Sequence, residues 1–266
     1  VGEMLDEAHA GKVRGMYIIG ENPVLSDPDA NHVVSSLKHL DFLVVQDIFL
    51  TETAELAHVV LPAASFAEKS GTFSNTERRV QMVRQAIEPV GDAKPDWQIV
   101  AEIGRRMGGD FNYSNPAEIM DEIAQETPSY GGISHQRLEE GSLHWPCPTV
   151  EHPGTPILHQ GKFSRGLGKF TPVSHIPPNE QPDQEYPFVL TTGRRLQHYH
   201  TGTMTRRTSL EELAPEELLE INPKDASKLA LIDGDKVKIA SRRRELEVRV
   251  QVTDRVQEGL VFATFH

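Results

Sequence analysis

Residues 193–207 form the part of this sequence whose side chains are best suited to hold an anion. They include four arginines, two histidines, several hydroxyl groups and two glycines, but no acidic residue. Arginine offers paired N–H donors to a phosphate, and glycine lets the backbone approach a ligand closely. Because the whole chain has a net charge of −12, this acid-free stretch predicts a local anion site. We call it the basic loop; the alternative is that it is only a solvated loop.

Three polar loops, at residues 20–23, 46–48 and 62–65, each follow a short apolar run. If these runs are neighbouring parallel strands, the loops share the edge at which open α/β sheets bind ligands. Carboxylates and amides at that edge could read the N–H donors of a purine or pterin ring. The residues that offer them are Glu21, Asn22, Gln46 and Asp47. The alternative is that these side chains only close turns and cap helices.

Other nucleophiles and metal ligands are scattered. The single cysteine, Cys147, can form neither an internal disulfide nor an iron–sulfur site by itself. His198 and His200 form a His-x-His pair, but the four arginines nearby would repel a divalent cation. No Ser-His-Asp or Cys-His arrangement stands out. Any redox chemistry must therefore come from a bound cofactor or from elsewhere.

The elements that would position these residues begin with an α/β piece over residues 1–66. Apolar runs at residues 16–19, 42–45 and 59–61 alternate with helical patterns. Continuous β-branched runs separated by helices predict a parallel sheet that is buried on both faces.

Residues 67–184 are expected to form a helical and irregular bridging segment. One helix is predicted from Asp96 and a second from Pro116. Residues 68–81 are dense in small polar residues and are expected to form a loop. Residues 127–183 are rich in proline and glycine and show no clear periodicity, so we expect an irregular segment that wraps over other structure.

Residues 185–266 are expected to form a β-rich domain. Short strands are predicted at residues 188–190, 237–239, 246–252 and 260–265, with one helix capped by Asn222. Several short strands with one helix suggest a small β-barrel domain.

Length and composition limit the class of protein. The chain has 266 residues, 38% hydrophobic and 25% charged, as in a soluble globular protein. No apolar run is long enough to span a bilayer, and the net charge of −12 argues against a nucleic-acid partner. The sequence begins at Val1 without an initiator methionine and ends directly after an apolar run, so we interpret it as a piece of a longer polypeptide.

Several motifs, in the same order, are similar to those of the large subunit of molybdopterin oxidoreductases. They lie at residues 20–23, 46–53, 59–63, 71–81, 95–97 and 200–206. Within that family the chain resembles the formate dehydrogenase alpha subunits most closely, as a C-terminal fragment, and the resemblance covers essentially the whole chain. Two positions depart from the family pattern: Ser70, where an acidic residue is common, and His58, where Asp is usual.

The resemblance implies a bis-(molybdopterin guanine dinucleotide) cofactor that carries molybdenum or tungsten. It also implies that the C-terminal β-barrel is of the double-psi, aspartate-decarboxylase-like type and is truncated here. The α/β piece would hold one guanosine end, and the barrel would line the pterin and phosphates. The cofactor-binding residues that it implies are Gly20, Glu21, Asn22, Ser26, Gln46, Asp47, Gly193, Arg194, His198, Tyr199, His200 and Thr201.

The resemblance further implies what a longer parent would contain. The family's metal-ligating cysteine or selenocysteine, the neighbouring His and Arg, and the cysteines of its 4Fe-4S clusters all precede the matched part. This chain would then supply cofactor-binding walls but no catalytic residue and no metal ligand. The parent would be cytoplasmic, oxidise formate to CO2 and pass electrons to electron-accepting subunits.

Three alternatives stay open. A nitrate reductase would share the cofactor and the fold, and would differ at the metal ligand and its neighbours. A non-catalytic relative, such as the large subunit of respiratory NADH dehydrogenase, would keep the fold and lose the pterin site, and the basic loop and residues 20–23 argue against it. A stand-alone anion- or nucleotide-binding module would require this chain to be complete.

Overall fold

The computed structural model describes residues 1–265, which form two compact units. The first unit comprises Val1–Val24 and Asp29–Thr171, and the second comprises Leu25–Pro28 and the chain from Pro172 onward. The division into three pieces that we predicted from the sequence stays a prediction.

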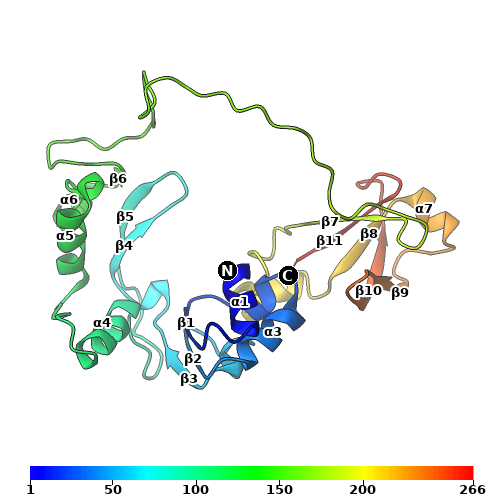
Figure 1. The fold of residues 1–266 in the computed structure, drawn as a ribbon, viewed down its shortest axis with the longest axis horizontal. Helices are drawn as coiled ribbons and strands as arrows, with labels where there is room; N and C mark the ends of the chain where they lie inside the picture. Colours follow the sequence, from blue (N-terminus) through cyan, green and yellow to red (C-terminus); the bar gives the residue numbers. More distant parts are fainter. Residues whose placement is uncertain (266) are drawn as a thin grey trace. The chain divides into compact units, whose positions relative to one another are not determined.

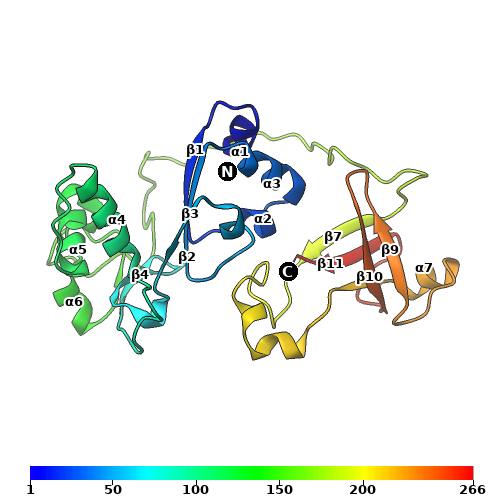
Figure 2. The same ribbon diagram turned by 90° about the horizontal axis from the view of Figure 1, so that it is seen from below.

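The first unit is built on a parallel sheet of three strands. Its strand order is β1-β2-β3, with β1 at Gly15–Ile19, β2 at Phe42–Asp47 and β3 at Val59–Pro62. The helices around it are α1 (Gly2–His9), α2 (Pro23–Ser26), α3 (Ala30–Lys38) and the 3-10 helix η1 (Ala54–Leu56). The predicted parallel arrangement of the three apolar runs is confirmed (Figures 1 and 2).

The two faces of this sheet are buried unequally among the described residues, which departs from the expectation of a sheet buried on both faces: one face carries the core, and on the other Gln46 is buried while several side chains are exposed. Both α1 and α3 pack on the same face, and their apolar side chains form one core with those of β2 (Figure 2). That core contains Leu5, Ala8, Val33, Leu37, Leu43 and Val45. The alternate side chains of the strands point to the other face, where Tyr17 is 39%, Ile19 44% and Phe42 51% exposed.

Residues 68–81 contain strands, so the expectation of a plain loop was wrong. The strand β4 (Gly71–Ser74) pairs antiparallel with β5 (Arg79–Val83), and the short β6 (Leu143–His144) joins β5. The Asn75 carboxamide closes the turn by accepting the N–H groups of Glu77 at 3.1 Å and Arg79 at 3.0 Å. Small polar residues concealed these strands because only Val80 among them is fully buried.

Both predicted helices of the bridging segment are present. They are α4 (Asp96–Arg106) and α5 (Pro116–Glu126), and the Asn115 side chain caps α5 by accepting the N–H groups of Ala117 and Glu118. The irregular stretch after α5 also contains the 3-10 helix η3 (Pro128–Tyr130) and α6 (His135–Glu140), which its sequence pattern did not reveal. A small core of Val80, Met120, Ile133, Leu138 and Cys147 joins these elements.

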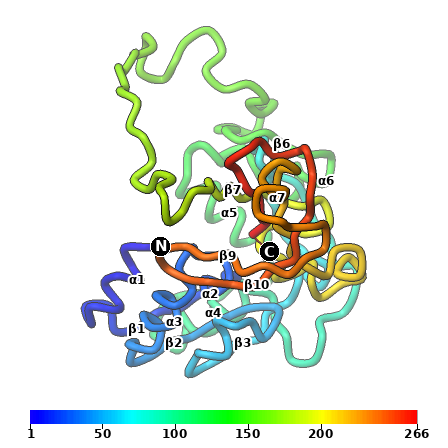
Figure 3. Tube along the Cα trace, turned by 90° about the vertical axis from the view of Figure 1, so that its right-hand side faces the viewer, coloured from blue at the N-terminus to red at the C-terminus, as the bar shows by residue number. Residues whose placement is uncertain are grey.

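The connection from β6 to β7 is long. Residues 145–188 contain no helix or strand, and the connection is the yellow-green trace in Figures 1 and 3. No helix within residues 1–265 combines the length and the apolar character that crossing a membrane requires.

The second unit is an open mixed sheet of five strands in the order β7-β11-β8-β10-β9. The strands are β7 (Val189–Gly193), β8 (Leu218–Ile221), β9 (Lys236–Ala240), β10 (Glu245–Val252) and β11 (Leu260–Thr264). The remaining elements are η4 (Thr205–Arg207), η5 (Ser209–Leu213) and α7 (Pro223–Lys228), which Asn222 caps.

The β-barrel that we predicted for this unit is not closed among the described residues, whose strands form an open sheet. A barrel requires its two terminal strands to pair with each other, whereas β7 pairs only with β11 and β9 only with β10 in this part of the chain. Apolar side chains of the sheet and of α7 form the core of this unit. They are Leu219, Ile221, Ala226, Val248, Val250 and Val261. The sequence pattern had not indicated β8.

Candidate functional site

The three strand-end loops of the first unit meet at one edge, as predicted. The backbone N–H of Gly20 donates to the Gln46 carbonyl at 2.9 Å, and that of Ala63 donates to the Asp47 carbonyl at 3.0 Å. Gly20 has a φ of +64°, a left-handed conformation that favours glycine at this turn. The parallel register of the sheet therefore brings the predicted polar residues of two strands into one neighbourhood.

Asn22 at this edge joins its loop to residues 52 and 53 through hydrogen bonds. It is buried, and its Oδ1 accepts the Thr53 hydroxyl at 2.7 Å and the Thr53 N–H at 3.2 Å. Its Nδ2 donates to Glu52 at 2.8 Å. In contrast, the Glu21 side chain is exposed and makes no hydrogen bond or ion pair within the described chain. Glu21 is thus available to a ligand, while Asn22 fixes the shape of the loop.

Gln46 is completely buried and joins two other side chains. Its Oε1 accepts the Tyr17 hydroxyl, and its Nε2 donates to Asp96 at 2.6 Å. The Lys69 ammonium pairs with the second Asp96 oxygen. Burial and the nearby Asp96 charge raise the pKa of Tyr17 above its usual value. The amide that we expected to read a purine is therefore engaged inside the protein.

Asp47 also uses part of its carboxylate to shape its own loop. One oxygen accepts the N–H of Ile48 at 2.7 Å and that of Phe49 at 3.4 Å. Ser26 is exposed in α2 and lies in the segment Leu25–Pro28, which is grouped with the second unit. Sequence reasoning did not include Tyr17, Lys69 or Asp96, because nothing in their local patterns distinguishes them.

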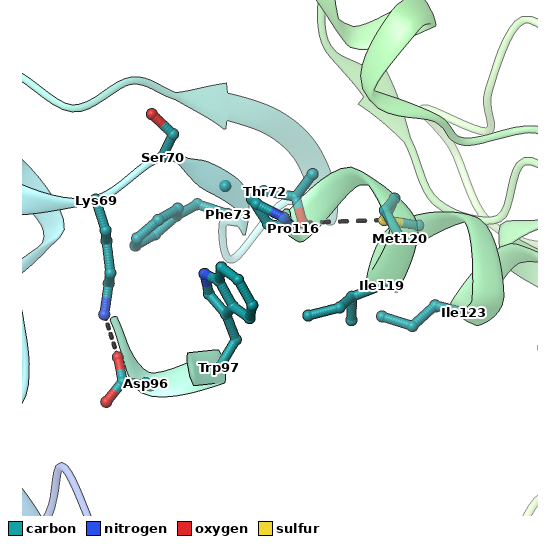
Figure 4. A pocket seen from close by; sticks show the side chains of 11 residues that line it. Lys69, Ser70, Thr72, Phe73, Asp96, Trp97, Pro116, Ile119, Met120 and Ile123 are labelled. Carbon is teal, nitrogen blue, oxygen red and sulfur yellow. Dashed lines mark hydrogen bonds and ion pairs between the residues drawn. The ribbon is translucent and has the colours of Figure 1, made fainter. Parts of the chain in front are cut away.

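A pocket of about 280 Å³ lies beside the Lys69–Asp96 pair, between the β4–β5 hairpin and helices α4 and α5 (Figure 4). Trp97, Ile119 and Ile123 face it together, as Figure 4 shows. The one cationic side chain of its lining, Lys69, is paired with Asp96. The pocket therefore offers an apolar space and no excess positive charge for a phosphate.

In the second unit the basic loop begins where β7 ends, at Gly193. A Cβ atom at this position would lie 2.8 Å from the ring of Phe262 on β11, so a side chain could enter only if that ring moved. Further along, the Arg194 guanidinium lies 3.3 Å from the His200 ring nitrogen. Tyr199 is exposed and contacts His200 edge-on, with ring centroids 4.3 Å apart.

His198 is the buried anchor of the basic loop. Its Nε2 lies 2.9 Å from the Ala214 carbonyl and its Nδ1 lies 3.1 Å from the Thr205 hydroxyl. Because a carbonyl only accepts, Nε2 is the donor to Ala214. The imidazole thus holds the loop against the segment after η5; whether it also contacts a ligand stays a prediction, as it does for Thr201.

A larger pocket of about 530 Å³ opens beside the basic loop. Residues from the basic loop, β8, β10, the β10–β11 connection and β11 line it: Arg194, Arg195, Leu196, Gln197, Glu220, Gln251, Arg255, Val256 and Phe262. The Arg255 guanidinium is held by Glu220 at 2.9 Å and by Gln251 at 3.1 Å. Three arginines thus face one carboxylate.

Arg195 shows that this pocket has spare hydrogen-bonding capacity. Its Nη2 is buried and has no hydrogen-bond partner within residues 1–265. A buried charged donor without a partner is costly, so an anion that accepts from it would be stabilised. Sequence reasoning found the basic loop but missed Glu220, Gln251 and Arg255. Only the strand pairing brings these to the loop, since no local motif marks them.

No group of three or more His, Cys, Asp or Glu side chains in the described part of the chain is arranged to hold a metal ion. Cys147 is fully buried, and its Sγ lies 3.3 Å from the His152 carbonyl. The feature of the described side chains that favours a ligand is the unpartnered Arg195 donor, which suits an anion.

Comparisons with known proteins match both units to families. Residues 1–106 match the family model described as molybdopterin oxidoreductase, and residues 188–266 match that of the molybdopterin dinucleotide binding domain. Among solved structures, acetylene hydratase from Pelobacter acetylenicus superposes with a TM-score of 0.74 over 98% of this chain and 38% of its own, at 18% identity. That likeness concerns the fold alone.

The curated relatives are much longer than this chain. The F420-dependent formate dehydrogenase subunit alpha of Methanocaldococcus jannaschii is 52% identical over 100% of this chain and 40% of its own length. The F420-dependent formate dehydrogenase 2 subunit alpha of Methanococcus maripaludis is 52% identical over 96% of this chain and 38% of its length. A probable oxidoreductase of Bacillus subtilis, YjgC, is 41% identical over 98% of this chain and 27% of its own. The chain thus spans at most about two fifths of these relatives.

Proposed function

Since the chain belongs to the molybdopterin oxidoreductase family, we propose that it is the cofactor-binding part of a formate dehydrogenase large subunit. The complete subunit would oxidise formate to CO2. The 52% identity to two formate dehydrogenase alpha subunits supports this substrate over the nitrate of a nitrate reductase.

The observation that carries the proposal is the unpartnered Arg195 donor in the pocket beside the basic loop. The cofactor that the family uses, bis-(molybdopterin guanine dinucleotide), contains phosphates, and a buried guanidinium with a free N–H fits such a group. Arg195 and Arg255 would hold the phosphates. Gly193, with no side chain, would keep the start of the loop open.

The other residues divide into those that would touch the cofactor and those that would position them. Arg194, Tyr199, His200 and Thr201 of the basic loop would line the cofactor, and Glu21, Ser26 and Asp47 would contact the guanosine end. Asn22, Gln46 and His198 would act mainly through the loops that they hold. Gly20 would supply the turn. The bound molybdenum or tungsten cofactor would supply the two-electron redox chemistry.

We propose that the metal ligand and the 4Fe-4S cysteines of the complete subunit lie outside these 266 residues. Cys147 does not fit a metal ligand, because it is fully buried and packed among backbone carbonyls. The fragment would therefore bind and orient the cofactor without catalysing turnover by itself. A non-catalytic relative would lack use for the unpaired Arg195 donor, which makes that alternative the weaker one.

The names of the two relatives at 52% identity favour one electron acceptor. Both are named F420-dependent, so we propose that an F420-reducing subunit accepts the electrons. Formate-dependent reduction of F420 by the assembled enzyme tests this acceptor separately from the cofactor.

The decisive experiment is a content analysis of the purified full-length subunit. We expect molybdenum or tungsten, with two guanines released per metal atom on acid hydrolysis. Absence of both metal and guanine would overturn the cofactor proposal. Turnover of nitrate without turnover of formate would instead retain the cofactor and replace the substrate.

A further inference from the structure

Four apolar side chains in the connection between β6 and β7 are almost fully exposed. Relative exposures are 89% for Leu167, 101% for Phe170, 89% for Val173 and 81% for Ile176. Single exposed apolar residues are ordinary on protein surfaces and need no explanation. These four differ because they recur at intervals of three residues, from position 167 to position 176. We call them the apolar stripe.

An interval of three matches one conformation of an unpaired chain. The polyproline II helix has three residues per turn and no internal hydrogen bonds, so residues three apart share one edge. Residues 167–177 lie in neither helix nor strand, and none of them makes a hydrogen bond within the described chain. Pro172 and Pro177 lie within this run, and proline favours the same conformation. At about 3.1 Å per residue the apolar stripe would be about 28 Å long.

The middle of this connection, residues 152–179, is basic in an acidic protein. From residue 152 to residue 179 there is no Asp or Glu, whereas Lys162, Arg165 and Lys169 are present. The complete chain has a net charge of −12. A connection that only had to span a distance would need no regular apolar edge, since polar and glycine-rich linkers do so in water. The apolar spacing and the positive charge suit a segment that binds in an apolar groove with acidic residues along its edges.

We propose that the apolar stripe docks into a groove of the same large-subunit polypeptide, in the part that lies outside these 266 residues. The proposal rests on the proposed function in one respect, that this chain is part of a longer large subunit. The curated relatives are long enough for such an occupant, because this chain covers only 40% and 38% of the two formate dehydrogenase subunits. The groove is apolar at intervals of about 9 Å, three residues of polyproline II, and acidic at its rims opposite Lys162, Arg165 and Lys169.

Limited proteolysis of the full-length subunit tests the docking. Trypsin cuts after Lys162, Arg165 and Lys169, so cleavage there reports whether the connection is free. We compare the natural subunit with a stripe variant, Leu167→Ser, Phe170→Ser, Val173→Ser and Ile176→Ser. The matched control is Ile157→Ser with Phe163→Ser, two exposed apolar residues off the three-residue register. We expect the stripe variant to be cut at least about tenfold faster, because cleavage follows the population of the undocked state.

A photo-crosslinker at position 170 identifies the occupant. We expect its crosslinked peptide to come from the large subunit outside these 266 residues. A crosslink within the 266 residues, or to a second subunit, overturns the proposal. So does equal cleavage of the natural and stripe variants, or a control variant that is cut as fast as the stripe variant. Cofactor content is measured on the same samples, so a failed cofactor proposal is recognised independently of this result.

Discussion

The strand-end edge of the first unit and the pocket of the second unit differ in how their polar side chains are satisfied. At the edge, Asn22 and Gln46 make their hydrogen bonds to other side chains of the protein. In the pocket, three arginines meet a single carboxylate, and the Arg195 Nη2 has no partner within residues 1–265. The side chains of the edge are therefore held in place without a ligand, whereas the pocket keeps an unsatisfied hydrogen-bond donor, the Arg195 Nη2. Residue type alone does not tell a side chain that holds a loop from one that binds a ligand. Whether its hydrogen bonds are already made within the protein does.

The largest expected effect concerns the first region. Replacing Asn22 by Ala leaves the Thr53 N–H and hydroxyl without their buried acceptor. We expect the free energy of unfolding to fall by about 2–3 kcal/mol, measured by urea denaturation. The matched control is Glu21→Gln next to it, which is exposed and should change stability by less than about 0.5 kcal/mol. Equal losses of unfolding free energy in both variants would contradict the proposal that Asn22 stabilises the loop.

In the second region, Arg195→Gln should weaken ligand binding and leave stability nearly unchanged. Because Nη2 has no partner within the described chain, its removal should leave the unfolding free energy nearly unchanged. Binding of inorganic pyrophosphate, measured by calorimetry, should weaken about tenfold, as for loss of one charged hydrogen bond. Arg243→Gln, at an exposed ion pair with Glu180, is the control and should leave binding unchanged. A destabilised Arg195→Gln variant with normal pyrophosphate affinity would mean that Arg195 serves the fold and not a ligand.

Glu220→Gln sharpens the charge argument with a smaller effect. The substitution removes the one carboxylate of the pocket lining and releases Arg255. We expect pyrophosphate affinity to rise about two- to fivefold, since repulsion between the anion and Glu220 disappears. Unfolding should become easier by about 1 kcal/mol, because the half-buried ion pair is lost. Weaker pyrophosphate binding by this variant would mean that Glu220 chiefly positions Arg255 for the ligand.

The smallest effect is the alkaline pH dependence of the strand-end edge. Burial and the Asp96 charge raise the pKa of Tyr17 above the ordinary value of 10.0. The unfolded chain therefore loses this proton at lower pH than the folded protein does. The stabilisation is complete below pH 10 and is lost as the pH rises through the folded pKa. Tyr17→Phe should flatten the decline in the free energy of unfolding above that pH, relative to the natural protein.

Sequence patterns predicted the elements whose information is local. The parallel strands of the first unit, the caps of α5 and α7, and the basic loop all depend on neighbouring residues. The strands β4 and β5 were missed because small polar residues do not alternate clearly with apolar ones. Whether the predicted β-barrel closes was not predictable, because pairing between distant strands does not follow from the local pattern of either strand.

The candidate site was predictable only in part, for the same reason. Charge clustering along the chain revealed the basic loop. Asp96 reaches Gln46 from 50 positions away, and Arg255 reaches the basic loop through the β10–β11 connection. Their roles require the fold. The composition of a loop can suggest a ligand's charge, but which donors stay free depends on partners far along the chain.

The close approach at Gly193 makes positions 193 and 262 share one space. The Phe262 ring lies where a side chain at position 193 would begin, and it also forms a wall of the pocket. Any relative that acquires a side chain at the first position must therefore shrink or shift the second. A substitution at position 193 should therefore reshape the mouth of this pocket through Phe262, either by moving its ring or together with a smaller residue at position 262.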